Sequence, residues 1–317
     1  MAGESLYFGR AYRLTLEGKE FGSKIFETQG GLPALDIKFD VEYARGCTSR
    51  EGTVSVLGLS YQTISSILAL SAIDRARAYS EMIHIKLEAG YQTGAGLLDI
   101  LDGYVYKATV TAPPEMWIKM KVAEYNPYCG NTIQFDSDPE LMPIRPYLDT
   151  ILQKYSKIEG VQFKVVDKTR DKLLDSKVKR GISLKGNSYT LRGIIAKLSE
   201  ELSPEVMFIM RTYAASGNER IIEVHAKSDK EGSTGPDIHI DKDNGLLSVT
   251  GIDAVQGTIT AFLDGRCDDQ LSHMVLKSQL NPEANGKYLI VRKQYVGHYR
   301  GKEWYVRYSC KDRVVKS

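Results

Sequence analysis

The sequence predicts a mainly β protein with a small α+β region in its middle. Apolar and polar residues alternate with a period of two through both ends of the chain, which is the pattern of half-buried strands. The middle mixes that period with helical spacing, and a proline-rich stretch precedes it. We therefore predict two antiparallel β domains, over residues 1–125 and 246–317, flanking a linker and small α+β domain over residues 126–245.

The first 125 residues contain the clearest strand, at residues 35–43. Its apolar face consists of Leu35, Ile37, Phe39, Val41 and Tyr43. Similar alternation predicts further strands at residues 12–16, 54–56, 83–89, 104–111 and 117–122. Ile64, Ile67 and Leu68 have helical spacing and predict one short helix after Ser60. Many alternating strands with a single helical insertion favour an antiparallel barrel or sandwich.

The middle region begins with turn chemistry between residues 125 and 146, which contain Pro127, Pro139, Pro143 and Pro146. Pro146 can occupy the first position of a helix. The apolar face of that helix would consist of Leu148, Ile151, Leu152 and Tyr155. A strand is predicted at residues 161–166, and an amphipathic helix has its apolar face at Leu191, Ile194, Ile195, Leu198 and Leu202. A hairpin is predicted from 207–211 and 221–225, turning at Ser216, Gly217 and Asn218.

The last region returns to β structure. Strands are predicted at residues 246–249, 257–263, 274–276, 288–297 and 304–310. The last two are joined at Arg300 and Gly301, which are suited to the tip of a hairpin. A turn is predicted at residues 281–286.

Composition places the chain among ordinary globular proteins, with 42% hydrophobic residues, 26% charged residues and a formal net charge of +2. Its 19 tyrosines, against 8 phenylalanines, hint at a partner surface. The four cysteines, Cys47, Cys129, Cys267 and Cys310, lie far apart, so we expect free thiols and neither a disulfide framework nor a zinc site. We expect no signal peptide and no membrane insertion, because no basic and apolar leader and no apolar run of about 20 residues is present.

Recognised catalytic signatures are absent from the sequence, including the phosphate-binding glycine loops, the nucleophile elbow and the zinc-protease helix. The five dispersed histidines, His84, His225, His239, His273 and His298, have no metal-ligand spacing. The segment 241–245 begins like a calcium loop, but Ile252 stands where that loop requires glutamate, so a tight turn is predicted. Cys129 has no neighbouring base. We therefore predict no catalytic, cofactor-binding or metal-binding residues, although distant carboxylates can still converge.

Charge divides the nearly neutral chain into blocks. Residues 164–185 contain eight basic and three acidic residues, 231–270 eight acidic and two basic, and 287–317 nine basic and two acidic. Three interpretations stay open: an ordinary solvated surface, complementary surfaces between subunits or partners, and a nucleic-acid patch. That patch would comprise Arg292, Lys293, Arg300, Lys302 and Arg307 among Tyr295, Tyr299 and Trp304.

The order of these features resembles the baseplate hub and late-control proteins of phage tails. The matching pieces begin with the strand at 35–43, the strand end at 53–60 and the helix at 63–68. Ala89-Gly90-Tyr91 is similar to an A-G-Y strand of that family, and Leu101-Asp102-Gly103-Tyr104-Val105 follows it. Further matches are the helix at 191–195, the turn at 244–247 and a closing hairpin at Asn285-Gly286-Lys287-Tyr288, Val296-Gly297-His298 and Gly301-Lys302-Glu303-Trp304. The sequence departs from the family pattern at Gly58, at Leu101-Asp102 and after His298.

The resemblance implies a structural, non-enzymatic hub in the virion tail baseplate, assembled in the host cytoplasm. It implies a homotrimer whose first and last domains are tail-tube-like β-barrels. Such a trimer would join the hexameric tail tube, or a tube initiator, to the trimeric central spike, with the tape measure protein in its lumen and DNA as passing cargo. The alternatives are a hub-associated peptidoglycan hydrolase in the middle domain and a nucleic-acid-binding β module using the basic C-terminal strands.

Overall fold

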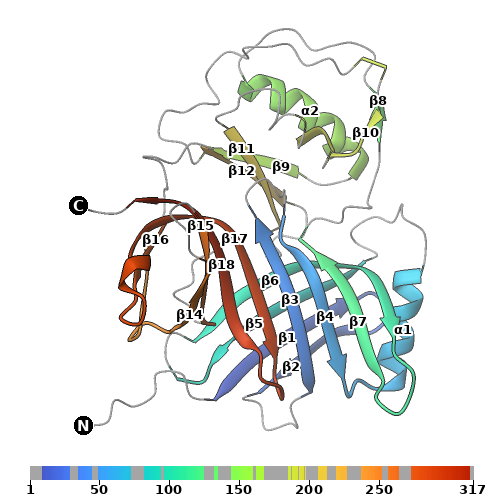
Figure 1. Ribbon diagram of the computed structural model, residues 1–317. Coiled ribbons are helices and arrows are strands. Elements are labelled where there is room, and N and C mark those ends of the chain that lie inside the picture. The colour runs from blue at the N-terminus through green and yellow to red at the C-terminus, as the bar shows by residue number, and fades with distance from the viewer. Residues whose placement is uncertain are drawn as a thin grey trace.

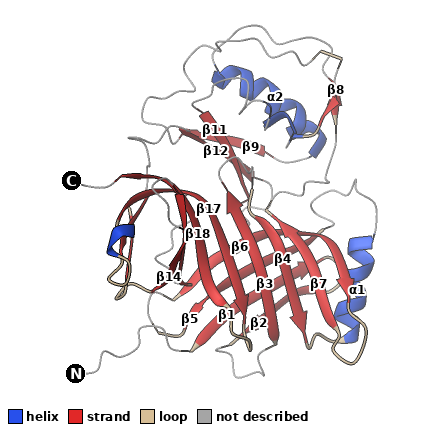
Figure 2. Cartoon of the chain, viewed as in Figure 1, coloured by secondary structure: helices blue, strands red, loops and turns tan. Residues whose placement is uncertain are grey.

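The protein is mainly β in a computed structural model (Figures 1 and 2). The structure describes residues 9–28, 35–44, 49–72, 82–93, 96–124, 132–134, 144–159, 162–167, 185–186, 188–191, 193–195, 197, 206–212, 219–226, 237–251, 256–263 and 273–314. A single 13-stranded sheet runs through both ends of the chain, in the order β14-β15-β18-β17-β3-β4-β7-β6-β5-β1-β2, with β16 also paired to β17 and β13 to β16.

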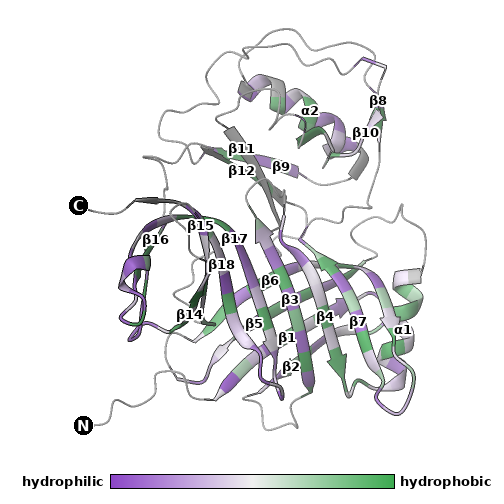
Figure 3. Ribbon diagram, in the orientation of Figure 1, coloured by the Kyte–Doolittle hydropathy of each residue, from purple (hydrophilic) through white to green (hydrophobic). Residues whose placement is uncertain are grey.

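The first β-domain curls seven strands around a core. They are β1 (Arg10–Gly18), β2 (Gly22–Glu27), β3 (Asp36–Ala44), β4 (Glu51–Leu57), β5 (Ile83–Tyr91), β6 (Leu97–Val110) and β7 (Trp117–Ala123). Every pair along β3-β4-β7-β6-β5-β1-β2 is antiparallel. Along every strand of this domain except β2, alternating hydropathy (Figure 3) turns most of the apolar side chains toward the core, whereas Ile25 on β2 is exposed.

Helix α1 (Tyr61–Ala72) closes one side of this core. Its buried face contains Ile64 and Ile67, which belong to the same apolar cluster as the strands. Ser60 begins the helix, since its hydroxyl accepts a hydrogen bond from the Thr63 amide at 3.2 Å. The short helix predicted after Ser60 is therefore confirmed.

Close backbone approach in this domain depends on glycine. A Cβ at Gly52 on β4 would lie 2.2 Å from the Asp40 carbonyl oxygen, and one at Gly103 on β6 would lie 2.4 Å from that of Ala123. Any larger residue would push neighbouring strands apart at these positions.

The second β-domain contains six strands of the same sheet. They are β13 (Ile238–Asp241), β14 (Leu246–Thr250), β15 (Gln256–Phe262), β16 (His273–Lys277), β17 (Gly286–His298) and β18 (Trp304–Val314), with the short helix η4 (Pro282–Ala284) before β17. The tip of the β17–β18 hairpin lies at Arg300 and Gly301 as predicted, and a Gly301 amide bond to the His298 carbonyl at 3.0 Å closes it. Its buried apolar residues, among them Tyr288 and Ile290, belong to the same cluster as those of the first β-domain.

The middle region contains a three-stranded sheet and a helix. The sheet has the order β11 (Val206–Thr212), β12 (Glu219–Ala226), β9 (Gln162–Asp167), and helix α2 (Ile144–Glu159) lies across it in Figure 1. The short strands β8 (Ile133–Gln134) and β10 (Ser188–Tyr189) form a separate pair. Tyr155 on α2 is buried and donates a hydrogen bond to the Tyr189 carbonyl at 2.5 Å.

The predicted fold class is confirmed: a mainly β chain with an α+β middle, in which β11 and β12 form the expected antiparallel pair. The antiparallel prediction is wrong for one pair of the large sheet, because β13 runs parallel to β16. Parallel neighbours need a crossover connection, and the chain between β13 and β16 supplies it. Sequence alternation missed β2, β8, β10 and β13, which are short or mostly exposed. The domain limits stay a prediction, although β13 precedes residue 246 and pairs within the second β-domain.

Several predicted features lie outside the described residues. They are Cys47, Cys129 and Cys267, the turn around Asn126, most of the basic block at 164–185, the tip at Ser216 to Asn218, and Leu198 and Leu202. The described helices include none long and apolar enough to cross a membrane.

Candidate functional site: the junction of the two β-domains

Strands β17 and β3 join the two β-domains through main-chain hydrogen bonds. Their antiparallel register runs from Arg292 opposite Ala44 to His298 opposite Lys38. Some 250 residues of chain separate the partners, as in the side-chain bond from Arg292 to Glu42. The two β-domains are therefore joined within one continuous sheet, by strand pairing.

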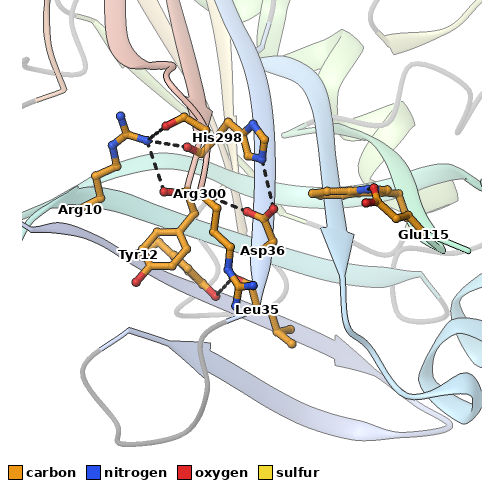
Figure 4. A network of polar contacts seen from close by, with 10 residues as sticks. Arg10, Tyr12, Leu35, Asp36, Glu115, His298 and Arg300 are labelled. Atoms are coloured by element: carbon orange, nitrogen blue, oxygen red, sulfur yellow. Dashed lines mark hydrogen bonds and ion pairs between the residues drawn. The ribbon is translucent and has the colours of Figure 1, made fainter.

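Arg10 at the start of β1 holds the tip of the β17–β18 hairpin (Figure 4). Its Nη1 donates to the carbonyl oxygens of His298 at 2.8 Å and Gly301 at 2.5 Å, with a longer bond to Tyr299 at 3.3 Å. Its Nη2 donates to the Lys302 carbonyl at 3.1 Å. A guanidinium carries five N–H donors in a fixed planar fork, so it can bond several carbonyl oxygens of one turn from both of its terminal nitrogens.

Asp36 at the start of β3 receives the same hairpin tip from the other side (Figure 4). One carboxylate oxygen lies 3.1 Å from Nε2 of His298, and the other accepts the Arg300 amide at 3.2 Å. The Tyr299 amide adds a bond to the Ile37 carbonyl at 2.9 Å. The tip is thus fixed between β1 and β3 of the first β-domain.

Trp304 packs beneath this tip, against the strand that carries the A-G-Y motif. Its Nε1 donates to the Gly90 carbonyl at 2.9 Å, and the Tyr91 hydroxyl donates to the Trp304 carbonyl at 3.3 Å. Its ring meets Phe39 edge to face at 5.3 Å, and Phe39 in turn fills the space that a side chain at Gly297 would need. Two pieces of the sequence resemblance, the A-G-Y strand and the closing hairpin, therefore meet at the base of the junction.

Tyr12 on β1 completes the junction. Its hydroxyl donates to the Leu35 carbonyl at 2.7 Å, and its ring packs edge to face on Tyr299 at 5.1 Å. Burial raises the pKa of the Tyr12 hydroxyl above its ordinary value, and the neighbouring Tyr299 raises it further. The hydroxyl therefore stays protonated and acts as a structural donor.

A buried ion pair lies within the first β-domain, apart from the junction. The Arg50 Nε is 2.5 Å from Glu124 Oε1, and both residues are at most 4% exposed. Arg50 also donates from its amide to Glu124 at 2.8 Å and from Nη1 to the Asp99 carbonyl at 2.9 Å. This pair ties the start of β4 to the end of β7 and to β6. Because these bonds join groups of the same domain, we assign the pair a structural role.

His84 on β5 lies between two carboxylates on the outer side of the same domain. Its Nε2 is 2.6 Å from Asp102 Oδ1, and its Nδ1 is 3.3 Å from Glu17 Oε2. Burial by itself lowers the pKa of His84, but the hydrogen bond and charge of Asp102, assisted by Glu17, outweigh it and raise the pKa. Two of the five histidines, His84 and His298, therefore have carboxylate partners that their sequence positions did not indicate.

The basic patch predicted from the C-terminal strands does not assemble as one surface. Lys293, Tyr295 and Trp304 are buried. Arg292 pairs with Glu42, and Arg307 donates to Gln294 at 3.1 Å. Successive side chains of a strand point to opposite faces, so some residues of the patch lie in the core and others on the outer face. The sequence alone does not show which residues of neighbouring strands share a face.

The segment at 241–245 forms the predicted tight turn. One Asp241 carboxylate oxygen accepts the Asp243 and Asn244 amides at 2.9 and 2.8 Å, and Gly245 has a φ of 90°. Within the described ranges, no group of three His, Cys, Asp or Glu side chains is placed to hold a metal ion. Cys310, the cysteine that the structure describes, is a buried free thiol whose pKa burial raises to about 12.

Sequence reasoning found the hairpin of the junction but missed Arg10 and Asp36. The Arg10 side chain meets carbonyl groups 288 to 292 positions further along the chain. No local pattern marks such a pairing, since an arginine at a strand start and an aspartate before an apolar strand are both ordinary.

Comparison with known proteins identifies solved structures with a similar fold. No family model matches the chain, and no curated protein matches it in sequence. Among solved structures, a tail protein of Neisseria meningitidis aligns with a TM-score of 0.58 and 5% identity, covering 96% of this chain and 97% of that one. The 43 kDa tail protein of prophage MuSo2 from Shewanella oneidensis aligns with a TM-score of 0.57 and 10% identity, covering 94% and 97%.

A third similar structure is the E. coli c3393 protein, a component of the type VI secretion system described as similar to the T4 tail proteins gp27 and gp5. It aligns with a TM-score of 0.55 and 10% identity over 90% of this chain and 78% of that one. The chain therefore has the fold of these phage tail and secretion-system proteins, and the predicted resemblance is confirmed at the level of fold.

Proposed function

We propose that the chain is a structural, non-catalytic hub of a phage-type tail baseplate. The observation that carries this proposal is the single sheet that runs through two barrel-like domains by way of β17 and β3. Two tail proteins share the fold over almost their whole length. Domains locked by main-chain hydrogen bonds suit a rigid junction better than a site that opens and closes around a substrate.

In this proposal three copies form a ring in the virion tail baseplate, assembled in the host cytoplasm. Six barrel-like domains would face a hexameric tail tube or tube initiator, and the opposite side would meet a trimeric spike. The tape measure protein would begin in the lumen, and DNA would pass as cargo. These partners follow from the fold likeness and from the sequence resemblance.

The two ends of the sheet support a head-to-tail ring. In the described part of the chain, β2 and β14 end the main path of the sheet and β13 ends its branch through β16, so each of the three has one edge without a strand partner there. Of these strands, β2 and β14 also expose an apolar side chain, with Ile25 57% and Leu247 44% exposed. Exposed edges invite pairing, and two unlike edges that pair between copies generate a closed ring if the rotation closes.

Native mass, measured by light scattering on the purified full chain, tests the proposal. A trimer alone, or a complex of three copies with three copies of a spike protein, is the expected result. A monomer that binds neither a spike nor a tube protein would contradict the hub.

Edge variants make this test sharper. Ile25→Lys and Leu247→Lys should each abolish the closed ring, because a head-to-tail ring needs both edges. Tyr61→Lys is the matched control, since Tyr61 on α1 is 79% exposed and lies on neither edge. Mixing the two edge variants should give at most a heterodimer. Loss of assembly in Ile25→Lys alone would instead indicate pairing of like edges.

The alternative of peptidoglycan cleavage in the middle domain has no support from the residues described there. Loss of turbidity in purified cell walls, removed by a carboxylate substitution, would be the result that establishes it.

A further inference from the structure

Exposed lysines lie side by side on the face of the first β-domain that points away from its core. Lys107 on β6 is directly opposite Lys121 on β7, and Lys119 follows on the same face of β7. Lys38 on β3 lies two strands further on, and its ammonium is 3.9 Å from the centre of the Trp117 ring. We call these four side chains, Lys38, Lys107, Lys119 and Lys121, the lysine face.

This arrangement opposes stability. Like charges directly across two antiparallel strands repel each other, and Lys107 and Lys121 occupy such positions. Lys119 lies about 7 Å along the strand from Lys121. The described residues offer Lys107, Lys119 and Lys121 no ion-pair partner. Because no carboxylate of the described residues neutralises these three lysines, we infer that an external anion does so.

The acidic side chains that β3 carries on this sheet face are engaged elsewhere. Glu42 pairs with Arg292, and Asp40 accepts a hydrogen bond from the Gln294 amide at 2.8 Å. Asp36 holds the hairpin tip. These three carboxylates lie on β3, two strands away from β7, and Asp102 on β6 pairs with His84. Glu51 on β4 lies diagonally across from Lys121. Lys107, Lys119 and Lys121 nevertheless form a local group of positive charge on β6 and β7.

The groups between the lysines fit a phosphodiester backbone better than a protein surface. Thr109, Ser55 and Thr53 lie opposite or beside the lysines and supply short hydroxyl groups. Among the described residues, the exposed large apolar side chain nearest in sequence to Lys107 is Val110. Val110 lies on the opposite face of β6 from Lys107. Protein interfaces depend on buried aromatic and apolar anchors, whereas phosphates are contacted by lysines and hydroxyls.

We propose that the lysine face binds the phosphodiester backbone of nucleic acid without sequence preference. This site differs from the basic patch predicted at the C-terminal strands, and it does not depend on the tail role. The phosphate chemistry is common to single strands and duplexes, so the test uses both.

Fluorescence anisotropy of labelled random-sequence DNA, single-stranded and duplex, with the full chain at increasing salt tests the proposal. Binding at about 50 mM salt should weaken steeply as salt rises. The variant Lys107→Ser/Lys119→Ser/Lys121→Ser should lose at least about tenfold in affinity, and its log–log salt slope should shrink by roughly 2 to 3 units. Thermal melts establish that the variant is folded.

The matched control removes three exposed lysines from other surfaces, as Lys19→Ser/Lys242→Ser/Lys277→Ser. Its net charge changes equally, so an unchanged slope in the control assigns the binding to the lysine face. Equal loss in both variants would reduce the effect to net charge and overturn the proposal. No DNA binding by the wild type at low salt would overturn it as well, and so would equally tight binding to polyglutamate, which would assign the face to an acidic protein.

Discussion

The two β-domains share one sheet, but they differ in what holds each of them together. The first has seven strands, a helix over its core and its own buried ion pair between Arg50 and Glu124. The second lies against the first through β17, and its longest hairpin is fixed by Arg10, Asp36 and Gly90, all residues of the first domain. We infer that the first domain is the more self-sufficient folding unit and that the second is stabilised by docking onto it.

The largest expected effect breaks the first domain from within. Glu124→Ala leaves the Arg50 guanidinium buried without its counterion, which should lower the free energy of unfolding by about 3–5 kcal/mol. Urea denaturation followed by circular dichroism measures this loss. The double variant Arg50→Met/Glu124→Leu removes both charges together and should recover most of the stability. An unchanged free energy of unfolding in Glu124→Ala would show that the ion pair does not stabilise the first domain.

A smaller effect should separate the second domain from the first. Trp304→Phe keeps most of the ring packing but removes the donor to the Gly90 carbonyl, at an expected cost of about 1–3 kcal/mol. Cys310, which is 2% exposed and has a pKa of about 12, reports opening of the second domain.

The measurement is the rate of Cys310 alkylation, in a chain whose other three cysteines are replaced by serine. Labelling should accelerate in Trp304→Phe and stay slow in Tyr305→Phe, which alters a neighbouring, partly exposed ring. Equal labelling rates in the wild type and in Trp304→Phe would show that the second domain does not rely on docking.

A pH-dependent effect is expected from His84 in the first domain. The folded-state pKa of His84 is raised, so its contribution to stability is fully present below the unfolded value of about 6.5 and is lost as pH rises through the folded pKa. The urea midpoint of the wild type should therefore fall between pH 6 and pH 8 by more than that of Asp102→Asn, which weakens the charge partner. Parallel profiles for the two proteins would remove His84 as the cause.

The smallest expected effect is a gain in stability. Lys107→Glu replaces a like-charge pair with an opposite-charge pair across β6 and β7, which should raise the free energy of unfolding by a few tenths of a kcal/mol. Differential melting in low salt detects it, and high salt should abolish it. The same variant should bind DNA more weakly, which would link the cost in stability to the proposed use of the lysine face.

Strand alternation was sufficient to predict most of the β structure. Residues 35–43, 83–89 and 304–310 alternate strictly, and β3, β5 and β18 follow them closely. It failed for β2 and β13, because an exposed or four-residue strand has too few buried positions to show a period. The family motifs were recognisable for a related reason, since Gly90 and Gly297 stand where close packing permits no side chain.

The sequence by itself determined the class of fold, the hairpin tip at Arg300 and Gly301, and the turn at 241–245, because period, turn chemistry and glycine placement are local properties. Only the tertiary structure decided which distant groups meet. Arg10 contacts carbonyl groups almost 300 positions away, and the C-terminal basic patch divides while lysines on β6 and β7 come together. The physical reason is strand register: it sets every cross-strand neighbour, and it is selected by the packing of the whole sheet.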